Sequence, residues 1–287
     1  MDAEFEEKEY EFPLNSQLLW GNQNIWTPGQ VFEGNFGIDA ALEVHRQDFW
    51  DMVGYPFPLE GVVLSDFKFG YVWRRLNRQR PLPTFKLNLF IQTKRPEILK
   101  NRPSNLKALG LGSPYWRFEI KNHQQTLLHQ LKLKLNRRAF VAYACAAFGK
   151  HSELYHHTQN KTLVENSTFV KVEKMDTHHK WIYDAPGSSG IAMSDPELIE
   201  ETPLFREIES VAENFEVEND NPSDNLRLIS NAINEICQEL QDDNIFAREI
   251  YRRYRYSSDR IRSSYLRQFV NVANFSLLSN TQWFVIK

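Results

Sequence analysis

The chain has 287 residues and a mass of 33.8 kDa, which is enough for one large domain or two modest ones with a buried core. Hydrophobic residues make up 41% of the chain and charged residues 25%, close to the globular averages, so the composition excludes a fibrous repeat and a low-complexity chain. A formal charge of -3 excludes a uniformly basic protein, although this average hides segments of opposite charge.

The sequence carries no signal for a membrane or for secretion. It has no run of about 18 apolar residues, and residues 1–12 are acidic where a secretory signal would be positively charged. The two cysteines, Cys145 and Cys237, lie among apolar residues and cannot form a disulfide framework. We therefore expect a cytoplasmic protein that makes no contact with a membrane.

Charge divides the chain into segments. We expect residues 1–24 to be an acidic N-terminal segment, with a solvated tail over residues 1–12, and residues 200–222 to be an acidic linker or an acidic helix face. Residues 74–107 carry ten basic side chains against the single acid Glu97. Seven arginines lie between positions 248 and 267, in a segment with a helical pattern. These arginines are equally consistent with a nucleic-acid surface and with a solvated helix face that pairs with the acidic stretch.

The hydrophobic pattern predicts elements in the order helix, strand, strand, strand, helix, strand. The first helix falls in residues 25–36 and the three strands in 36–44, 62–73 and 86–93. Leucines at 3–4 spacing within residues 117–138 predict the second helix, and residues 139–148 form the next strand. Further strands are expected at 167–173 and 179–187, followed by an amphipathic helix and two more helical stretches from Ser223 to about Ser276.

Four polar residues lie at the ends of predicted strands, where a metal site or a catalytic site is expected. Glu33 and Asp39 precede and enter the first strand, and Gln92 and Lys94 end the apolar strand LNLFIQTK. Carboxylate and amide oxygens suit a hard divalent cation. Because Gln92 and Lys94 are two residues apart, their side chains share one face of a strand, where an amide oxygen could lie near a metal and an ammonium near a phosphate.

The order of elements, with Glu33, Gly37-Ile38-Asp39 and Gln92-Thr93-Lys94, resembles the PD-(D/E)xK nuclease superfamily, most nearly its Mrr-like branch with a Q-x-K variant. The resemblance covers roughly residues 25–150. It implies a restriction-endonuclease-like α/β fold with a mixed sheet flanked by helices, and a magnesium-dependent phosphodiesterase in which manganese could substitute. Asp39, Glu33 and Gln92 would be the metal ligands, and Lys94 would activate or position the attacking water.

Several alternatives remain open for the site. Asp66-Phe67-Lys68 and Glu119-Ile120-Lys121 are also (D/E)-x-K triplets, and Glu43 is a further possible ligand. Tyr115, Arg117 and Gln124 flank the start of the second helix, and we expect phosphate or base contacts there, with a satisfied polar cluster that holds the loop as the alternative. Arg95, which follows Lys94, is the fourth predicted nucleic-acid contact.

The sequence thus predicts a nuclease domain over residues 25–199 and a helical C-terminal region over residues 223–287. The expected function is magnesium-dependent cleavage of DNA, and RNA is an alternative substrate. By analogy with other nucleases of this branch, the expected role is prokaryotic antiviral defence. The expected assembly is a homodimer or a subunit of a larger defence complex, with the C-terminal helices as the assembly surface. The alternatives are an inactive nucleic-acid- or protein-binding module on the same scaffold and an oligomeric scaffold.

Overall fold

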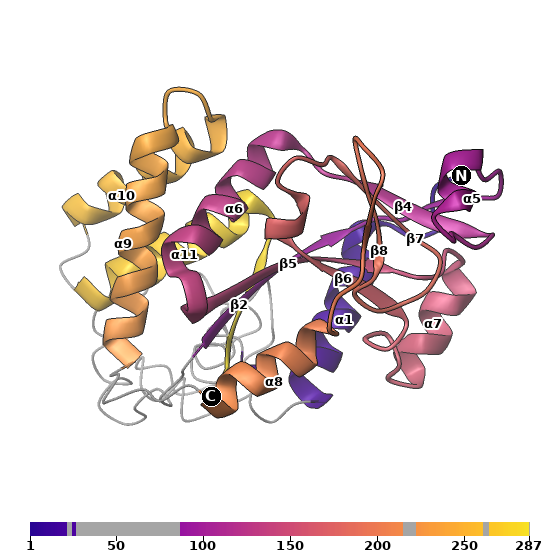
Figure 1. The fold of residues 1–287 in the computed structure, drawn as a ribbon. Helices are drawn as coiled ribbons and strands as arrows, with labels where there is room; N and C mark the ends of the chain where they lie inside the picture. The colour runs from indigo at the N-terminus through magenta and orange to yellow at the C-terminus, as the bar shows by residue number, and fades with distance from the viewer. Residues whose placement is uncertain (22–24, 27–86, 215–221, 261–263, 287) are drawn as a thin grey trace.

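A computed structural model of the chain describes residues 1–21, 25–26, 87–214, 222–260 and 264–286 (Figure 1). Within these ranges the protein is a mixed α/β fold with two sheets flanked by helices, as predicted. The first sheet, which we call the main sheet, has the order β1 (Ile25–Trp26), β10 (Gln282–Ile286), β2 (Leu87–Lys94), β5 (Ala139–Ala146) and β6 (Ser167–Lys171).

Strands β2 and β5 form the centre of the main sheet. They run parallel, with Asn88 opposite Ala139 and Lys94 opposite Cys145, and every residue of both strands is buried. A parallel pair needs a crossover connection, and helix α6 (Asn122–Leu135) lies in the chain between them. The other strand pairs of this sheet are antiparallel. The predicted strands at 86–93 and 139–148 are therefore confirmed, as is the helix between them.

Helices cover both faces of the main sheet. Phe90 of β2 belongs to the hydrophobic core beneath α6, α9 (Pro222–Leu240), α10 (Ile245–Arg260) and α11 (Ser264–Ser279). Leu89, its neighbour, belongs to the core beneath α1 (Glu7–Gly21), α7 (His151–Gln159) and α8 (Leu204–Asn214). Figure 1 shows α9 and α10 on one side of the central strands and α8 on the other. Alternate residues of β2 thus face different helical layers.

The second sheet is antiparallel throughout. It packs on the hydrophobic core that contains Phe90 and lies beneath α6 and α9. Trp116 and Phe118 join that core from one face of the sheet, while Tyr115 belongs to a small core with Leu106 of the short helix α5 (Ser104–Ala108). The strands are, in order, β3 (Glu97–Leu99), β4 (Tyr115–Glu119), β7 (Lys180–Tyr183), β8 (Gly190–Met193) and β9 (Glu197–Ile199). Strands β6 and β7 confirm the predictions for residues 167–173 and 179–187, and they lie in different sheets.

The acidic N-terminal segment is not a solvated tail, and that expectation was wrong. Residues 7–21 form α1, and Tyr10, Leu14 and Leu18 are buried against the main sheet together with Phe5. These three helical residues are four positions apart and form one apolar stripe. The acidic side chains that dominate the composition of the segment lie between the buried positions.

For the acidic segment of residues 200–222 the linker interpretation was wrong, and the alternative, a helix face, is confirmed over residues 204–214. The described part of this segment includes α8, whose Leu204 and Ile208 are buried in the core shared with α1. Lys171 of β6 forms ion pairs with Glu201 and Glu207, so two of the acids anchor the segment to the main sheet.

The C-terminal region is helical, as predicted, and it is built into the same core as the main sheet. The predicted apolar stripe on α9 is buried beside the leucines of α6, so this stripe is not available to another chain. After α11 the chain enters the main sheet as β10, between β1 and β2, which the sequence analysis did not predict. None of the described helices is both long and apolar enough to cross a membrane. The buried residues of this stripe are Leu226, Ile229, Ile233 and Ile236, whereas Leu240, the last residue predicted for it, is only partly buried.

Candidate functional site

The predicted pair Gln92 and Lys94 lies at the carboxyl end of β2. Gln92 contacts the end of α11 and Lys94 contacts α6, and both helices cover the same face of the main sheet. Thr93, between them, donates a hydrogen bond to Glu11 of α1 on the opposite side. The alternation expected for a strand therefore brings Gln92 and Lys94 onto one face.

Gln92 is fully buried, and only half of its side-chain amide is satisfied. Its Nε2 donates to the carbonyl of Ser279 at 2.6 Å, whereas its Oε1 has no hydrogen-bond partner among the described residues. A buried polar atom without a partner costs free energy comparable to a lost hydrogen bond. This oxygen thus makes no hydrogen bond to the described residues, and its role as a metal ligand stays a prediction.

Lys94 is 8% exposed and has weak polar contacts. Its Nζ lies 3.4 Å from Oε1 of Gln124 on α6 and 5.6 Å from the ring centre of Tyr143 on β5. The Tyr143 hydroxyl donates to Oε1 of Gln125 at 2.6 Å, which fixes the ring beside the ammonium. Within the described ranges, no carboxylate lies within ion-pair distance of this ammonium.

Burial lowers the pKa of Lys94 to about 8, because a charged ammonium loses its hydration in this position. The negative charge of Glu7 opposes that shift, whereas the positive charge of Lys121 adds to it. Lys94 is thus a desolvated cation with a carboxylate nearby, an environment that recurs at functional sites and also at structural ones.

The sequence analysis missed two carboxylates that α1 brings to the end of β2. Glu11 accepts hydrogen bonds from Thr93 and from Lys8, and Glu7 accepts one from Asn280 at 2.6 Å. Burial raises the pKa of Glu7, and the charge of Lys94 partly offsets this effect. Glu7 and Glu11 are four residues apart, beside the apolar stripe of Tyr10, Leu14 and Leu18. This spacing is the sequence feature that could have predicted a helix with both carboxylates on one side.

Gln124 is the one predicted nucleic-acid contact that the structure places beside Lys94. Arg95 instead binds the N-terminal segment, donating to the carbonyl of Ala3 at 2.5 Å and pairing with Glu6 at 3.0 Å. The structure therefore directs the Arg95 guanidinium away from the face that carries Gln92 and Lys94.

Tyr115 and Arg117 lie on strand β4, which comes directly before α6 and which the sequence analysis did not predict. The Tyr115 hydroxyl donates to the carbonyl of Asn101, and the Arg117 Nε donates to Glu97 at 2.5 Å. Phe118, the residue that approaches Tyr143, points to the other face of the strand. Arg117 is thus held within the second sheet, and the Tyr115 hydroxyl is held by the chain that follows β3.

The two acidic residues predicted as metal ligands, Glu33 and Asp39, lie outside the described residues. The same applies to the alternative residues Glu43, Asp66 and Lys68. In the other alternative triplet, Glu119 ends β4 and pairs with Lys180 at 3.0 Å, while Lys121 is exposed at the start of α6. The ion pair and the exposure make this triplet a poorer site than Gln92 and Lys94.

The described residues contain no group of three or more histidine, cysteine, aspartate or glutamate side chains that could hold a metal ion. The donor chemistry at the end of β2 nevertheless fits a hard cation in part. It includes the unpartnered Oε1 of Gln92 and the carboxylate of Glu7, which is close enough to influence Lys94. A complete site would need further oxygen ligands, which the sequence assigns to Glu33 and Asp39.

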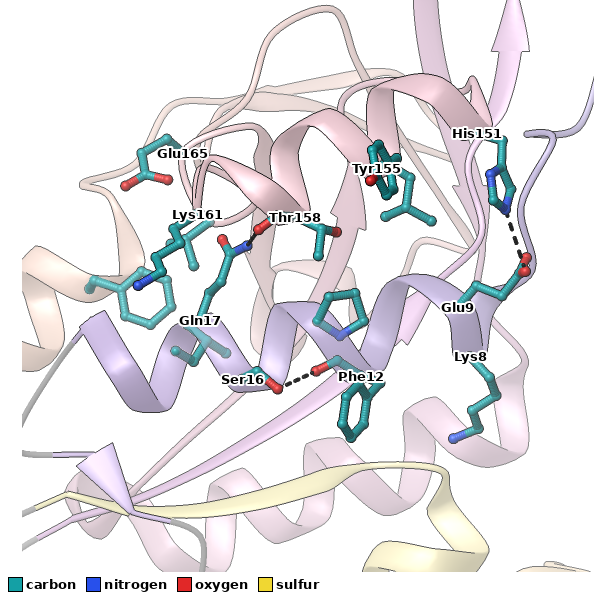
Figure 2. A pocket seen from close by; sticks show the side chains of 15 residues that line it. Lys8, Glu9, Phe12, Ser16, Gln17, His151, Tyr155, Thr158, Lys161 and Glu165 are labelled. Carbon is teal, nitrogen blue, oxygen red and sulfur yellow. Dashed lines mark hydrogen bonds and ion pairs between the residues drawn. The ribbon is translucent and has the colours of Figure 1, made fainter.

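A separate hollow of about 1040 Å³ lies between α1 and α7, and Figure 2 shows the side chains around it. Its walls are mainly apolar and include Phe12, Leu154 and Phe205, while Gln17 crosses from α1 to donate to carbonyls of α7. None of the predicted site residues lines this hollow. The end of β2 therefore remains the candidate site.

We compared the chain with protein-family models, curated proteins and solved structures, and none of them matches it.

Proposed function

We propose that this protein is a magnesium-dependent nuclease that hydrolyses phosphodiester bonds of DNA, with its site at the carboxyl end of β2. The observation that carries the proposal is the arrangement of Gln92 and Lys94 on one buried strand. The Gln92 amide oxygen has no partner there, and the ammonium of Lys94 has no carboxylate within ion-pair distance among the described residues. An unpaired buried cation is costly to the fold, and a role in binding a phosphate would account for it.

In this proposal the strand supplies rigidity. Every residue of β2 is buried between β10 and β5, so Gln92 and Lys94 are held by two neighbouring strands and not by a loop. Gln124 and the ring of Tyr143 orient the ammonium. Lys94 would hold the attacking water or the scissile phosphate, since its positive charge complements the charge that develops on the phosphoryl oxygens.

Gln92, with Asp39 and Glu33, would hold a magnesium ion, and manganese could replace it. When bound, the ion would stabilise negative charge on the phosphoryl group and lower the pKa of a bound water. Glu7 would keep Lys94 charged through its own negative charge, since the charge of this carboxylate raises the pKa of the lysine.

The experiment is one cleavage assay on purified protein. Plasmid, linear DNA and RNA are each incubated with magnesium and with EDTA. We expect cleavage of DNA only with magnesium, and loss of cleavage in Asp39→Ala and Lys94→Ala. Absence of cleavage of every substrate by the wild-type protein, with magnesium or with manganese, would favour the inactive binding module on this scaffold.

A further inference from the structure

Helix α10 presents a row of arginines to solvent. Arg248, Arg252 and Arg255 are exposed and are spaced by four and three residues, so they lie along one face of the helix. Ala247 and Ile250, on the opposite face, are fully buried in the core shared with α6 and α9. The helix is thus anchored by one face and displays cations on the other.

The positive charge of this face is only partly neutralised within the chain. Helix α10 contains five arginines and two acids, Glu249 and Asp259. Glu249 accepts hydrogen bonds from Arg252 and from Arg253, all at 2.8 Å, and these bonds lower its pKa to about 2. One carboxylate is therefore shared by two guanidinium groups, and the face keeps a net positive charge.

The acidic stretch around residue 200, the other partner that the sequence suggested for these arginines, is used elsewhere. Glu201 pairs with Lys171 and Lys174, and Glu207 pairs with Lys171. These acids belong to the side of the main sheet that carries α8, whereas α10 packs on the opposite face (Figure 1). The structure therefore separates these two acids from the arginine face.

The arginine face begins beside the candidate site. The side chain of Asn244, just before α10, donates to the carbonyl of His123 at 2.8 Å, and the rings of Phe246 and His123 stack at 4.7 Å. His123 is followed by Gln124, which contacts Lys94. The first turn of α10 therefore packs on the turn of α6 that orients the lysine, and the arginines continue from there along the helix.

We propose that the exposed face of α10 binds the sugar–phosphate backbone of duplex DNA and holds it across the site at the end of β2. This inference rests on the proposed nuclease function and adds to it the surface that engages the substrate. Arginine suits the role because its planar guanidinium donates several hydrogen bonds to phosphate oxygens. A polyanion fits this face better than a membrane surface, since the apolar side of the helix is already buried.

The test measures binding of a short fluorescein-labelled DNA duplex by fluorescence anisotropy, in EDTA so that no cleavage occurs. The variant is Arg252→Gln with Arg255→Gln. We leave Arg248 unchanged because its guanidinium donates to the carbonyls of Gln241 and Asp242 and stabilises the turn before α10. The matched control is Arg137→Gln with Arg206→Gln, which removes the same charge from two exposed arginines outside α10.

Each lost phosphate contact reduces the slope of log affinity against log salt by about 0.9 and the affinity by roughly tenfold near 0.1 M salt. Because the α10 variant removes two such contacts, we expect it to lose roughly a hundredfold in affinity, with a slope lower by about two, while the control binds like the wild type. Glu249→Gln should change affinity in the opposite direction, because it removes the acid from the face. Thermal melts followed by circular dichroism check that each variant is folded.

Wild-type affinity in the α10 variant, or an equal loss in the control, would overturn the assignment of this face. Absence of duplex binding by the wild-type protein would overturn it too. The outcome is independent of the cleavage assay, since binding in EDTA requires neither magnesium nor Lys94. A protein that cleaves DNA but binds equally well without the α10 arginines would keep its nuclease function and lose this inference.

Discussion

The side-chain amide of Gln92 donates a 2.6 Å hydrogen bond to the main-chain carbonyl of Ser279, across a sequence separation of 187 residues. Ser279 is the last residue of α11, and three residues later, at Gln282, the chain enters β10, the antiparallel neighbour of β2. The C-terminal segment thus forms one wall of the candidate site and supplies a central strand of the main sheet. Its loss is expected to damage the fold and the site together.

The indole of Trp283 on β10 is a sensitive probe of this arrangement. It is 6% exposed, stacks on Phe90 at 6.2 Å and donates to Asn88 at 3.2 Å. Trp283→Ala should therefore lower the free energy of unfolding by about 3–5 kcal/mol, measured by urea denaturation. Phe12→Ala is the control, because Phe12 is 77% exposed and its truncation should change stability by less than about 0.5 kcal/mol. Equal losses in both variants would contradict the placement of β10.

The apolar stripe of α9 gives a second prediction. Ile233 is fully buried in the core shared with α6, so Ile233→Ala should cost about 2–5 kcal/mol of unfolding free energy without changing the molecular mass in light scattering. Leu228→Ala on the same helix is the matched control, since Leu228 is 39% exposed and should contribute far less. A change of oligomeric state with little loss of stability in Ile233→Ala would restore the stripe as an interface between chains.

Local patterns account for the elements that the sequence predicted correctly. The apolar run of β2, the leucines of α6 and the apolar run of β5 each carry their own periodicity within a few residues. For the same reason the expectation that Gln92 and Lys94 share a face is confirmed, because it follows from strand geometry alone. The segment 27–86, which carries Glu33 and Asp39, lies outside the described residues, and those roles stay predictions.

Other elements could not be inferred from local pattern. Strand β10 is the short run QWFVI, and what makes it an inner strand of the main sheet is its pairing with β2, which lies about two thirds of the chain length earlier in the sequence. Strand β4 alternates two aromatic residues that face the core, Trp116 and Phe118, with Tyr115 and Arg117. This two-residue period is short and directly precedes α6, so the sequence analysis assigned part of it to the helix. In the described part of α1, only Tyr10, Leu14 and Leu18, spaced by four residues within a mostly acidic segment, mark the buried face of the helix.

Lysine substitutions rank the candidate triplets. Lys94→Ala should remove cleavage, whereas Lys121→Ala and Lys68→Ala should keep most of it, because Lys121 is exposed at the start of α6 and lies outside the cluster around Gln92. Rates of plasmid cleavage with magnesium provide the measurement, and we expect a loss of at least about a hundredfold for Lys94→Ala alone. If Lys68→Ala were the inactive variant instead, the site would move to Asp66-Phe67-Lys68.

The last prediction separates function from stability at Lys94. Lys94 is 8% exposed, so its ammonium has lost most of its hydration. In exchange it makes one hydrogen bond of 3.4 Å and no ion pair among the described residues, which compensates only a small part of that loss. Methionine is similar in length and carries no charge, so Lys94→Met should raise the free energy of unfolding by about 1–3 kcal/mol while abolishing cleavage. Urea denaturation measures the first effect and the plasmid assay the second. Lys121→Met is the control, because its exposed ammonium stays hydrated and its replacement should leave both properties near wild type. A Lys94→Met protein that is less stable than the wild type would mean that the lysine holds the fold together, and the case for its catalytic role would lose its physical basis.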